Sequence, residues 1–552
     1  MRVLFIVPPY VTTDKLVSFL YPLPLGPLSV AAYLRERGYE VSIKDFVATT
    51  ESRSATEPLS FKGLRNPTYV HFGYDYDYID KWIEENINDY DIVGVSALQT
   101  PVFEGVYEVI KIIKKHTDIP VVAGGPHPST RPDEFLEESG ADSVVIGEGE
   151  EAFRVLLEDY KENNTIKKMY REDYIEDLDS LPFPAWDLID FNDYPKAGGK
   201  LRAVISTSRS CPFECTFCSV HTIWGRKWRA HSPLYVLKHI MHLYRLGVRQ
   251  ITIIDDNFLL KESRAIEILK GIIAMKKEKK LKGVSFLFEE GMQVTHGKDR
   301  ELVKHLYEAG FKDVRLGLES LSSATLEYMK KPMVVEDFRK AIEVFEEFGY
   351  VPRVFYILGF KTDTVKSMIE NVIDLSEFDI NIRANNLKIY PNTDMHKEYL
   401  EEGLIDETYD WRMSTFYTPP ASDFTMEEIS RLKAVLSALE FCSSEKINVF
   451  TSDFDTLMKT YKKYGYEVEL REDHFVLKGN PKSWRVDNSI KAITKILAMR
   501  FGIVPLKFYK SKVNEGESVY MVDDMKSSYF DETMLEVLKE KGLLLGRMGE
   551  SG

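Results

Sequence analysis

Short apolar segments alternate with longer amphipathic segments along the first 150 residues. The apolar segments predict strands over 3–7, 39–44, 91–96, 120–123 and 143–146. The amphipathic segments predict helices over 26–37, 101–115 and 132–139. Buried strands that alternate with helices are typical of a parallel sheet with helices on both faces. We therefore expect an N-terminal, doubly wound α/β domain over residues 1–160.

The helix expected over 101–115 has the clearest pattern. Thr100 suits the N-cap, and Pro101 suits the first helical position. One face of this helix would carry Val102, Val106, Val109, Ile110 and Ile113. We expect that face to pack against the sheet.

Four unusual loops follow the expected strands, at 8–10, 97–100, 124–128 and 147–150. Ligands of such sheets bind beyond the carboxyl ends of the strands, which is where these loops fall. Paired glycines in two of the loops would let the backbone approach a large ligand closely. Taken singly, each loop also fits an ordinary tight turn between strand and helix.

The alternation resumes in the middle of the chain. Residues 161–199, rich in acidic residues and proline, predict a linker. Strands are then expected near 201–205, 250–254, 284–288, 314–318, 354–358 and 382–389, the spacing of a partial (β/α)6 barrel over 200–400. The remainder, 401–552, combines an amphipathic helix at 425–441 with short strands near 466–470 and 475–477. This pattern predicts a small α+β or helical domain.

Composition limits the possible partners and compartments. The 552 residues include 72 Lys and Arg against 87 Asp and Glu, a net charge of −15, which argues against general affinity for nucleic acid or anionic membranes. No run of about eighteen apolar residues predicts a membrane span, and the start of the chain lacks the pattern of a signal peptide. The four cysteines form no disulfide framework, so we expect a reducing, cytoplasmic location.

Three of the four cysteines, Cys211, Cys215 and Cys218, lie within eight residues just after an expected strand. Three thiolates on a short loop can hold three irons of a [4Fe–4S] cluster and leave the fourth iron open to a substrate or cofactor. The alternative is a zinc site completed by His221. Structural zinc sites usually join two separated ligand pairs, however, and these four candidates lie on one turn.

The C-x₃-C-x₂-C spacing, with Phe217 before the third cysteine, resembles the signature of radical S-adenosylmethionine enzymes. The resemblance implies that the open iron binds S-adenosylmethionine and passes an electron that cleaves it to a 5′-deoxyadenosyl radical. The cofactor performs this chemistry, while the protein positions it. An electron donor such as ferredoxin or flavodoxin is implied as a partner.

Later segments, 315–320, 359–364 and 390–393, also resemble motifs of this family, and the first implies that Glu319 and Ser320 contact S-adenosylmethionine. Two more expected strands end in 255–257 and 289–293, where acidic residues could receive its amino group. The expected S-adenosylmethionine contacts are therefore Phe217, Asp256, Gln293, Glu319 and Ser320. Three positions depart from the family motifs, since Lys361 and Thr362 replace Pro-Gly and Asn392 replaces Gly. The alternative for the acidic residues is a structural ion pair. Arg229, in a segment similar to another family motif, could pair with a carboxylate of cofactor or substrate or close the loop onto the barrel.

Together and in order, the four N-terminal loops resemble the cobalamin-binding domain that precedes the radical core in one large class of these enzymes. The implied cobalamin contacts are Pro9, Leu98, Gln99, Thr100, Gly124, Gly125, Pro126, His127, Gly147, Glu148 and Gly149. The motif that supplies an axial histidine in other cobalamin proteins is missing, because residues 8–14 contain no histidine. We therefore expect cobalamin to bind without a histidine from that loop. His127 could reach cobalt or have a structural role.

The resemblance favours a cobalamin-dependent methyltransferase, which would move a methyl group from methylcobalamin to an unactivated carbon after hydrogen abstraction by the 5′-deoxyadenosyl radical. A cyclase or oxidoreductase with the same cofactors, and a non-catalytic cobalamin sensor, are the alternatives. The substrate could be a small molecule, a lipid or a peptide. A basic, aromatic segment at 500–512 could meet an acidic substrate or simply be a solvated face. Cys442, at the end of an apolar helix, is expected to be buried.

Overall fold

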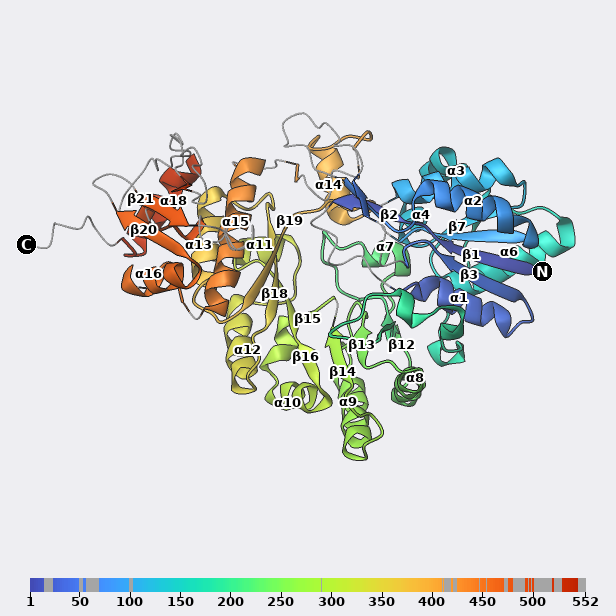
Figure 1. Ribbon diagram of the computed structural model, residues 1–552, viewed down its shortest axis with the longest axis horizontal. Coiled ribbons are helices and arrows are strands. Elements are labelled where there is room, and N and C mark those ends of the chain that lie inside the picture. Colours follow the sequence, from blue (N-terminus) through green and yellow to red (C-terminus); the bar gives the residue numbers. More distant parts are fainter. Residues whose placement is uncertain are drawn as a thin grey trace, which may run out of the picture. The chain divides into compact units, whose positions relative to one another are not determined.

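The computed structural model forms two compact units (Figure 1). The first contains Met1–Glu290, Lys304–Lys312 and Ile389–Thr415, and the second contains Gly291–Val303, Asp313–Lys388 and Phe416–Gly552. The structure describes residues 1–13, 23–48, 53–55, 69–98, 103–288, 290–409, 411, 418–419, 424–445, 447–452, 454–470, 475–479, 492–494, 496–497, 499–500, 519–520 and 529–544.

A parallel sheet of six strands forms the N-terminal part of the first unit. Its order is β3-β1-β6-β7-β8-β9, and every pair is parallel. The strands are β1 (Arg2–Val7), β3 (Glu40–Asp45), β6 (Ile92–Ser96), β7 (Val121–Gly124), β8 (Ser143–Val145) and β9 (Met169–Tyr170). The predicted doubly wound fold is confirmed. The last strand, β9, comes from the segment predicted to be a linker.

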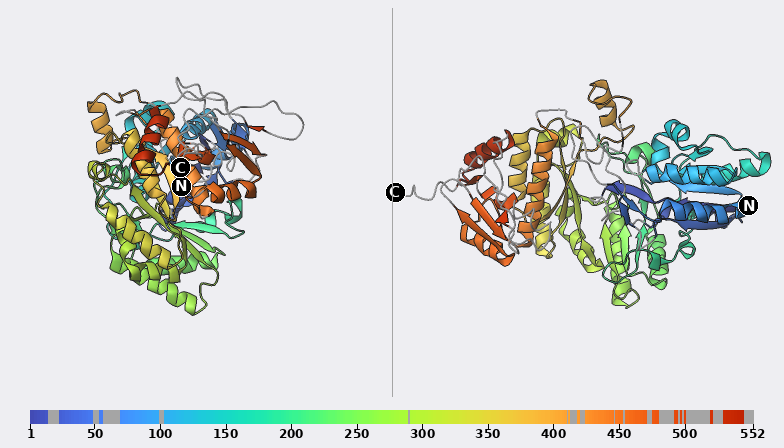
Figure 2. Two further views of the ribbon diagram at one scale, coloured as in Figure 1. Left: turned by 90° about the vertical axis from the view of Figure 1, so that its left-hand side faces the viewer. Right: turned by 45° about the horizontal axis from the view of Figure 1, so that its top comes forward.

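Helices cover both faces of this sheet (Figure 2). On one face α2 (Tyr76–Asn86), α3 (Glu104–His116) and α5 (Pro132–Ser139) enclose a core with the buried side chains of β1 and β6. On the other, α1 (Leu25–Arg35) and α6 (Gly149–Asn163) pack, with Phe153 beside Phe5 at 5.0 Å between ring centroids. A small antiparallel sheet of β2 (Tyr10–Thr13), β5 (Tyr69–Phe72) and β4 (Arg53–Ala55) was not expected.

Helix α3 corrects one expectation. Its predicted start at Pro101 is wrong, because the helix begins at Glu104 with Phe103 in the N-cap position. Its buried face is the predicted one, formed by Val106, Val109, Ile110 and Ile113, while Thr100, Pro101 and Val102 lie outside the described residues. In its first turn Gly105 lies against the chain after β1, where a Cβ atom would be 2.0 Å from the carbonyl oxygen of Pro9. This contact ties the start of the helix to the first loop of the sheet.

The first unit also contains one half of the predicted barrel strands. A sheet runs in the order β10 (Arg202–Ile205), β13 (Gln250–Ile253), β14 (Ser285–Phe288) and β16 (Phe311–Asp313). A short antiparallel hairpin, β11 (Ser208–Arg209) with β12 (Arg229–Ala230), encloses α7 (Val220–Trp224). The other helices and 3₁₀ turns are α4 (Pro126–Thr130), η2 (Ile87–Asp89), η4 (Leu178–Ser180), η5 (Trp186–Leu188), η6 (Phe191–Asp193), α8 (Pro233–Arg245), α9 (Glu262–Lys277), α10 (Arg300–Ala309) and α14 (Asp394–Glu401).

The second unit contains the other half of the predicted barrel strands. Its parallel sheet has the order β15 (Met292–Gln293), β17 (Arg315–Glu319), β18 (Arg353–Leu358) and β19 (Asn381–Asn386), so all six predicted barrel strands are present. With it lie η7 (Val294–Lys298), α11 (Ser323–Tyr328), α12 (Val335–Glu347) and α13 (Val365–Leu375). The predicted small α+β part consists of α15 (Met426–Ser444), α16 (Phe454–Lys463), α18 (Tyr529–Glu540) and the antiparallel strands β20 (Tyr466–Leu470), β21 (Phe475–Gly479) and β22 (Val519–Tyr520).

Two C-terminal expectations can be checked in the described part. Cys442 is 1% exposed, which confirms that it is buried. Of the basic segment 500–512 only Arg500 is described, and it is buried with hydrogen bonds to the carbonyl oxygens of Val449 and Ser452 at 2.9 and 2.8 Å. Among the described residues, no helix is both long enough and apolar enough to span a bilayer.

Candidate active site

The three clustered cysteines lie on the loop between β11 and α7, and all three side chains are half-buried. The β11–β12 hairpin closes the base of this loop. Within the loop the backbone N–H of Cys218 donates to the carbonyl oxygen of Cys215 at 3.1 Å. Phe217, predicted to contact S-adenosylmethionine, lies between these two cysteines in the sequence, and its side chain is half-buried.

Three consecutive residues at the end of β13 hold the base of the loop. Asp255 accepts hydrogen bonds from the backbone N–H and hydroxyl of Thr207, both at 2.5 Å, and from the hydroxyl of Ser208 at 2.6 Å. Asp256 accepts from the backbone N–H of Ser210 at 3.0 Å. The Asn257 amide donates to Cys211 Sγ at 3.8 Å. The carboxyl end of one buried strand thus positions the approach to the first cysteine.

Cys218 and Asp256 lie in an environment that disfavours negative charge. Burial raises the pKa of Cys218 to about 12, and Cys215, Asp256 and Cys211 raise it further. Burial also raises the pKa of Asp256 to about 7, with added repulsion from Glu290 and Asp255. Clustered thiolates in such a place need a positive partner, which an iron–sulfur cluster provides. The donor set therefore fits the predicted cluster.

The zinc alternative gains no support from the side chains. Among the residues described, no three His, Cys, Asp or Glu side chains converge closely enough to hold one metal ion. A zinc site needs its donors about 2.0–2.3 Å from a single point. In a [4Fe–4S] cluster each cysteine binds a different iron, so the thiols can be further apart.

Three of the predicted S-adenosylmethionine contacts belong to the second unit. Glu319 ends β17 and has a φ of 65°, in the left-handed region that side chains other than glycine seldom adopt. Its carboxylate accepts a hydrogen bond from Lys331 Nζ at 3.2 Å, and both side chains are largely buried. Ser320 accepts from the backbone N–H of Ser322 at 3.0 Å, and Gln293 ends β15 opposite Gly317. A strained backbone such as that of Glu319 is typical of ligand sites.

The loop 359–364 departs from the family motif but is well ordered by its own contacts. Asp363 is 3% exposed and accepts from the backbone N–H groups of Gly359 and Phe360 at 3.1 and 2.9 Å. It also accepts from the Thr325 hydroxyl at 3.0 Å. Burial raises the pKa of Asp363 to about 6 against the opposing effect of these hydrogen bonds. The carboxylate therefore closes the loop onto α11.

Asn392, which replaces a motif glycine, has a φ of 63°. Asparagine tolerates this left-handed conformation better than most residues, so the backbone that the motif needs is kept. Its side-chain amide donates to the carbonyl oxygen of Thr130 in α4 at 2.5 Å. Three residues later, the Met395 N–H donates to Thr216 O, within the cysteine loop, at 3.0 Å. Sequence reasoning missed this bridge between α4 and the cysteine loop.

The predicted cobalamin contacts lie at the carboxyl edge of the N-terminal sheet. Pro9 follows β1 and Leu98 follows β6, two adjacent strands at the point where the strand order reverses. This is the usual ligand position in such sheets. Gln99 and Thr100 lie outside the described residues.

The next loop, with Gly124, Gly125, Pro126 and His127, ends β7 and begins α4. Gly125 has a φ of 118°, and a Cβ atom there would lie 2.6 Å from the carbonyl oxygen of Ala97, so backbone packing requires this glycine. A Cβ on Gly124 would meet nothing closer than 3.8 Å. The space beside Gly124 fits the predicted close approach of a large ligand.

His127 is 2% exposed and is packed among aromatic rings. Its imidazole stacks on Phe103 at 5.1 Å between centroids, and its Nε2 lies 3.5 Å from the Tyr107 hydroxyl. Burial, with repulsion from Arg131, lowers the pKa of His127 to about 3, which keeps the ring neutral. These contacts are those expected for a structural role of the side chain, and contact of His127 with cobalamin stays a prediction.

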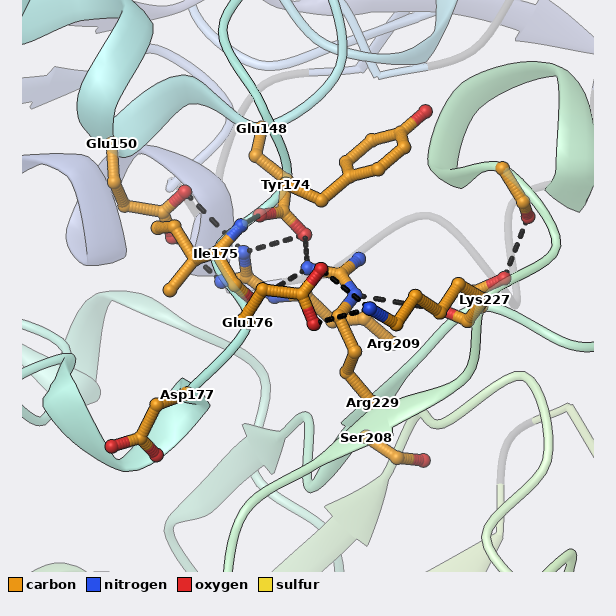
Figure 3. Close-up of polar contacts among 12 residues, drawn as sticks. Glu148, Glu150, Tyr174, Ile175, Glu176, Asp177, Ser208, Arg209, Lys227 and Arg229 are labelled. Carbon is orange, nitrogen blue, oxygen red and sulfur yellow. Dashed lines mark hydrogen bonds and ion pairs between the residues drawn. The ribbon is translucent and has the colours of Figure 1, made fainter.

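The last predicted cobalamin loop, Gly147 to Gly149, precedes α6 (Figure 3). The Glu148 carboxylate accepts from the Ile175 N–H at 2.9 Å and contacts the guanidinium groups of Arg209 and Arg229. Arg229 thus closes the cysteine loop against the N-terminal sheet. Its expected pairing with a carboxylate of cofactor or substrate stays a prediction. Sequence reasoning did not connect Arg209 with this site, and it did not pair Glu150 with an arginine.

Two family models match the chain. The B12 binding domain matches residues 16–157, and the Radical SAM superfamily matches residues 205–375. Together they cover more than half of the 552 residues. The predicted cofactors, cobalamin, S-adenosylmethionine and a [4Fe–4S] cluster, are confirmed by these matches.

Curated relatives of the chain include both methyltransferases and cyclases. An uncharacterized methyltransferase of Pyrococcus horikoshii is 29% identical over 459 residues, which are 79% of this chain and 92% of the relative. The bacteriochlorophyllide d C-8(2)-methyltransferase of Chlorobaculum tepidum is 28% identical over 59% of this chain and 73% of the relative. The anaerobic magnesium-protoporphyrin IX monomethyl ester cyclase of Rubrivivax gelatinosus is 25% identical over 79% of this chain and 76% of the relative.

Solved structures share the fold at lower identity. The radical S-adenosylmethionine methyltransferase TsrM from Kitasatospora setae aligns with a TM-score of 0.57 and 18% identity, over 73% of this chain and 75% of TsrM. The cobalamin-dependent radical enzyme OxsB aligns with a TM-score of 0.60 and 16% identity, over 99% of this chain and 79% of OxsB. With the two matched domains in the same order as the predicted sites, the chain belongs to the cobalamin-dependent radical S-adenosylmethionine enzymes.

Proposed function

We propose that this enzyme is a methyltransferase that acts on an unactivated carbon of its substrate. One observation carries the proposal: the sheet edge with the predicted cobalamin loops and the cysteine loop belong to one compact unit and are joined by buried contacts. A methyl source and a radical source held by one unit can act on the same substrate atom. Proximity of this kind accounts for a large part of enzymatic rate enhancement.

The bound cofactors would supply a transferable methyl group and a 5′-deoxyadenosyl radical that abstracts a hydrogen atom. The residues of the chain would hold and orient these groups. Cys211, Cys215 and Cys218 would bind three irons, while Asp255 and Asp256 hold the loop that carries the cysteines. Further contacts to S-adenosylmethionine would come from Phe217, Asp256, Gln293, Glu319 and Ser320.

The names of the relatives favour methyl transfer. The relative with 92% of its own length aligned is a methyltransferase, as is the one from Chlorobaculum tepidum. The cyclase of Rubrivivax gelatinosus supports the second candidate, a cyclase or oxidoreductase that uses the same cofactors without methyl transfer. A non-catalytic cobalamin sensor would leave the cysteine loop without a purpose.

Isotope labelling distinguishes these functions. The protein is reconstituted anaerobically with iron, sulfide and cobalamin, then incubated with metabolite extract, dithionite and methyl-deuterated S-adenosylmethionine. Deuterated methyl in a product, formed together with 5′-deoxyadenosine, supports the methyltransferase and identifies its substrate. A changed but unlabelled product would contradict methyl transfer. The matched control replaces Cys211, Cys215 and Cys218 by alanine and should form no 5′-deoxyadenosine.

The substrate belongs to one of three classes in this proposal: a small molecule, a lipid or a peptide. A small reducing protein such as ferredoxin or flavodoxin would deliver the electron. The thiol-bound cluster requires a reducing compartment, for which the cytoplasm is the proposed location.

A further inference from the structure

Two buried arginines face each other across the hairpin at the base of the cysteine loop. Arg209 and Arg229 are direct partners in the antiparallel β11–β12 register. Their side chains are 16% and 3% exposed. Like charges opposite each other on two strands destabilise the pair, and burial increases the penalty unless opposite charges lie close by. The hairpin therefore depends on a source of negative charge.

That charge comes from the start of α6, where Glu148 is the N-cap residue and Glu150 lies in the first turn. Glu150 accepts hydrogen bonds from Arg209 Nη2 at 2.6 Å and Nη1 at 3.4 Å. Glu148 Oε1 lies 2.7 Å from Arg229 Nη1 and 3.2 Å from Arg209 Nη1, ion-pair contacts without hydrogen-bond geometry. Both glutamate side chains are nearly fully buried, at 3% and 4% exposed. Two positive and two negative groups thus balance inside the protein.

The charges of the pair support each other. Burial by itself would raise the pKa of Glu150, but the charge and hydrogen bonds of Arg209, with help from Arg229, hold it below its ordinary value. Burial by itself would lower the pKa of Arg209, but Glu150 and Glu148 raise it. Each group of the Glu150–Arg209 pair is therefore held in its ionised form by its partner.

The polypeptide between the two domains is fastened by the same groups (Figure 3). Glu148 accepts the N–H of Ile175, and Arg229 donates to the carbonyl oxygen of Ile175 at 2.8 Å. The Arg229 guanidinium also lies 4.9 Å from the centre of the Tyr174 ring. These contacts fix the segment that follows β9 against both the sheet and the hairpin.

The positions of these residues in the sequence relate the buried charges to both predicted cofactor sites. Arg209 precedes Cys211, the first predicted iron ligand, by two residues. Glu148 lies between Gly147 and Gly149, two predicted cobalamin contacts. One buried set of charges thus joins the loop that would hold the iron–sulfur cluster to a loop that would hold cobalamin.

We propose that Glu148, Glu150, Arg209 and Arg229, here called the charge clamp, position the cobalamin loop against the cysteine loop and so set the separation between cobalt and the iron–sulfur cluster. The proposal rests on the proposed function only in requiring that both cofactors bind, and it does not require methyl transfer. The four residues are positioning residues. A misplacement of about 1 Å can reduce a rate by about 100-fold, so a rigid clamp matters for coupled chemistry.

The test measures the separation without relying on turnover. The reconstituted protein is poised with a reduced cluster and cob(II)alamin, both of which are paramagnetic. Their magnetic interaction, measured by electron paramagnetic resonance, weakens with the cube of the distance. The variant Glu150→Gln/Arg209→Gln removes both charges of one pair, so neither partner is left buried and uncompensated. In this variant we expect the magnetic interaction between the two centres to be weaker, or to be spread over a wider range of strengths. The iron and cobalamin content of the protein should be unchanged.

The chain offers a matched control. Lys227, just before β12, and Glu176, in the segment that follows β9, form an ion pair at 2.6 Å, but their side chains are 66% and 64% exposed. Exposed pairs of this kind contribute little to structure. The variant Glu176→Gln/Lys227→Gln should retain the magnetic interaction of the unmodified protein.

Hydrogen exchange of the cofactor-free protein gives a second measurement. In Glu150→Gln/Arg209→Gln we expect residues 147–149 to exchange about tenfold faster, while the buried strand β7 stays unchanged. Unaltered magnetic interaction and unaltered exchange in this variant would overturn the proposal, as would the absence of magnetic interaction in the unmodified protein with both cofactors bound. A failure of methyl labelling alone would count against the proposed function and leave the clamp intact.

Discussion

The Asn257 side chain is 5% exposed, and its amide donates to Cys211 Sγ at 3.8 Å. Hydrogen bonds to cluster sulfurs stabilise the more negatively charged, reduced state and so raise the reduction potential. Asn257→Leu removes the donor and keeps the volume. We expect the cluster potential to fall by tens of mV, on the order of one weak hydrogen bond. A redox titration followed by electron paramagnetic resonance measures it, and an unchanged or higher potential would contradict the role of Asn257.

A second single-residue prediction concerns Glu319. Its strained backbone and its hydrogen bond with Lys331 place a buried carboxylate at the end of β17. Lys331→Met leaves that carboxylate without this cation, so its orientation toward a ligand is lost. We expect binding of S-adenosylmethionine to weaken by about tenfold, or about 1.4 kcal/mol, in equilibrium dialysis. The neighbouring Lys330 is exposed, so the variant Lys330→Met serves as the control. It should bind S-adenosylmethionine as tightly as the unmodified protein.

At this scale the sequence identified residue types better than it identified their partners. The three cysteines and Asp256 were predicted from spacing and position, and the structure places them in one loop and its supporting strand. Glu148 was predicted to contact cobalamin, which stays a prediction, and its carboxylate faces two arginines far along the chain that the sequence did not indicate. Spacing indicates a type of chemistry on one loop, but it carries no information on which distant side chain folds against it.

At the scale of elements, the segment before α14 joins two loops of the first unit. Asn392 has a left-handed backbone and donates to Thr130 in α4. Asn392→Ala loses that hydrogen bond and adds strain of about 1–2 kcal/mol. Asn392→Gly loses the hydrogen bond but tolerates the backbone. We expect both to lower the melting temperature, with alanine the more damaging, and the reverse order would contradict the left-handed assignment.

The loop closed by Asp363 should respond to pH. Burial raises the pKa of its carboxyl group from 3.8 to about 6, so the folded state retains a proton that the unfolded state has released in this range. The unfolded state binds fewer protons there, and stability therefore falls as the pH rises from about 4 to 6. Over this pH range the free energy of unfolding should fall by up to about 3 kcal/mol, and Asp363→Asn should abolish this fall.

Denaturant unfolding of both proteins at several pH values checks this prediction. The stability difference between Asp363→Asn and the unmodified protein should grow in favour of the variant as the pH rises through the window. Asp379→Asn is the matched control, because Asp379 is an exposed aspartate near the end of the same sheet. A difference that is flat with pH would contradict the burial effect at Asp363.

Elements with a long periodic pattern were predictable, and short ones were not. The apolar faces of the helices and the buried strands of both sheets follow from hydrophobic spacing. The hairpin β11–β12 has only two residues in each strand, too few to show alternation. The start of α3 was also missed, because Gly105 and its contact with Pro9 depend on a loop distant in sequence.

At the scale of the whole molecule, the sequence predicted a linker between domains at 161–199, from its prolines and charges. In the structure this segment adds β9 to the sheet and buries Leu178 and Leu181 beside Tyr33 of α1. Further along, Trp186 Nε1 donates to His239 of α8 at 3.0 Å. Composition indicates which residues prefer solvent on average, but a proline-rich segment with interspersed large apolar residues can still pack between two sheets.

Limited proteolysis of the intact protein tests this packing. Chymotrypsin cuts after aromatic residues that are not followed by proline, and in the segment Tyr170, Tyr174, Trp186 and Phe191 meet this requirement. Flexible tethers are preferred sites of cleavage. Here, however, Trp186, Phe191 and Tyr194 are each less than 9% exposed, and the Tyr194 hydroxyl donates to Asp45 at 2.7 Å. We therefore expect the first cuts to fall elsewhere in the chain, while the urea-unfolded protein is cut within the segment. A first cut between 183 and 194 in the native protein would show that the segment is a free tether and would contradict the packing described here.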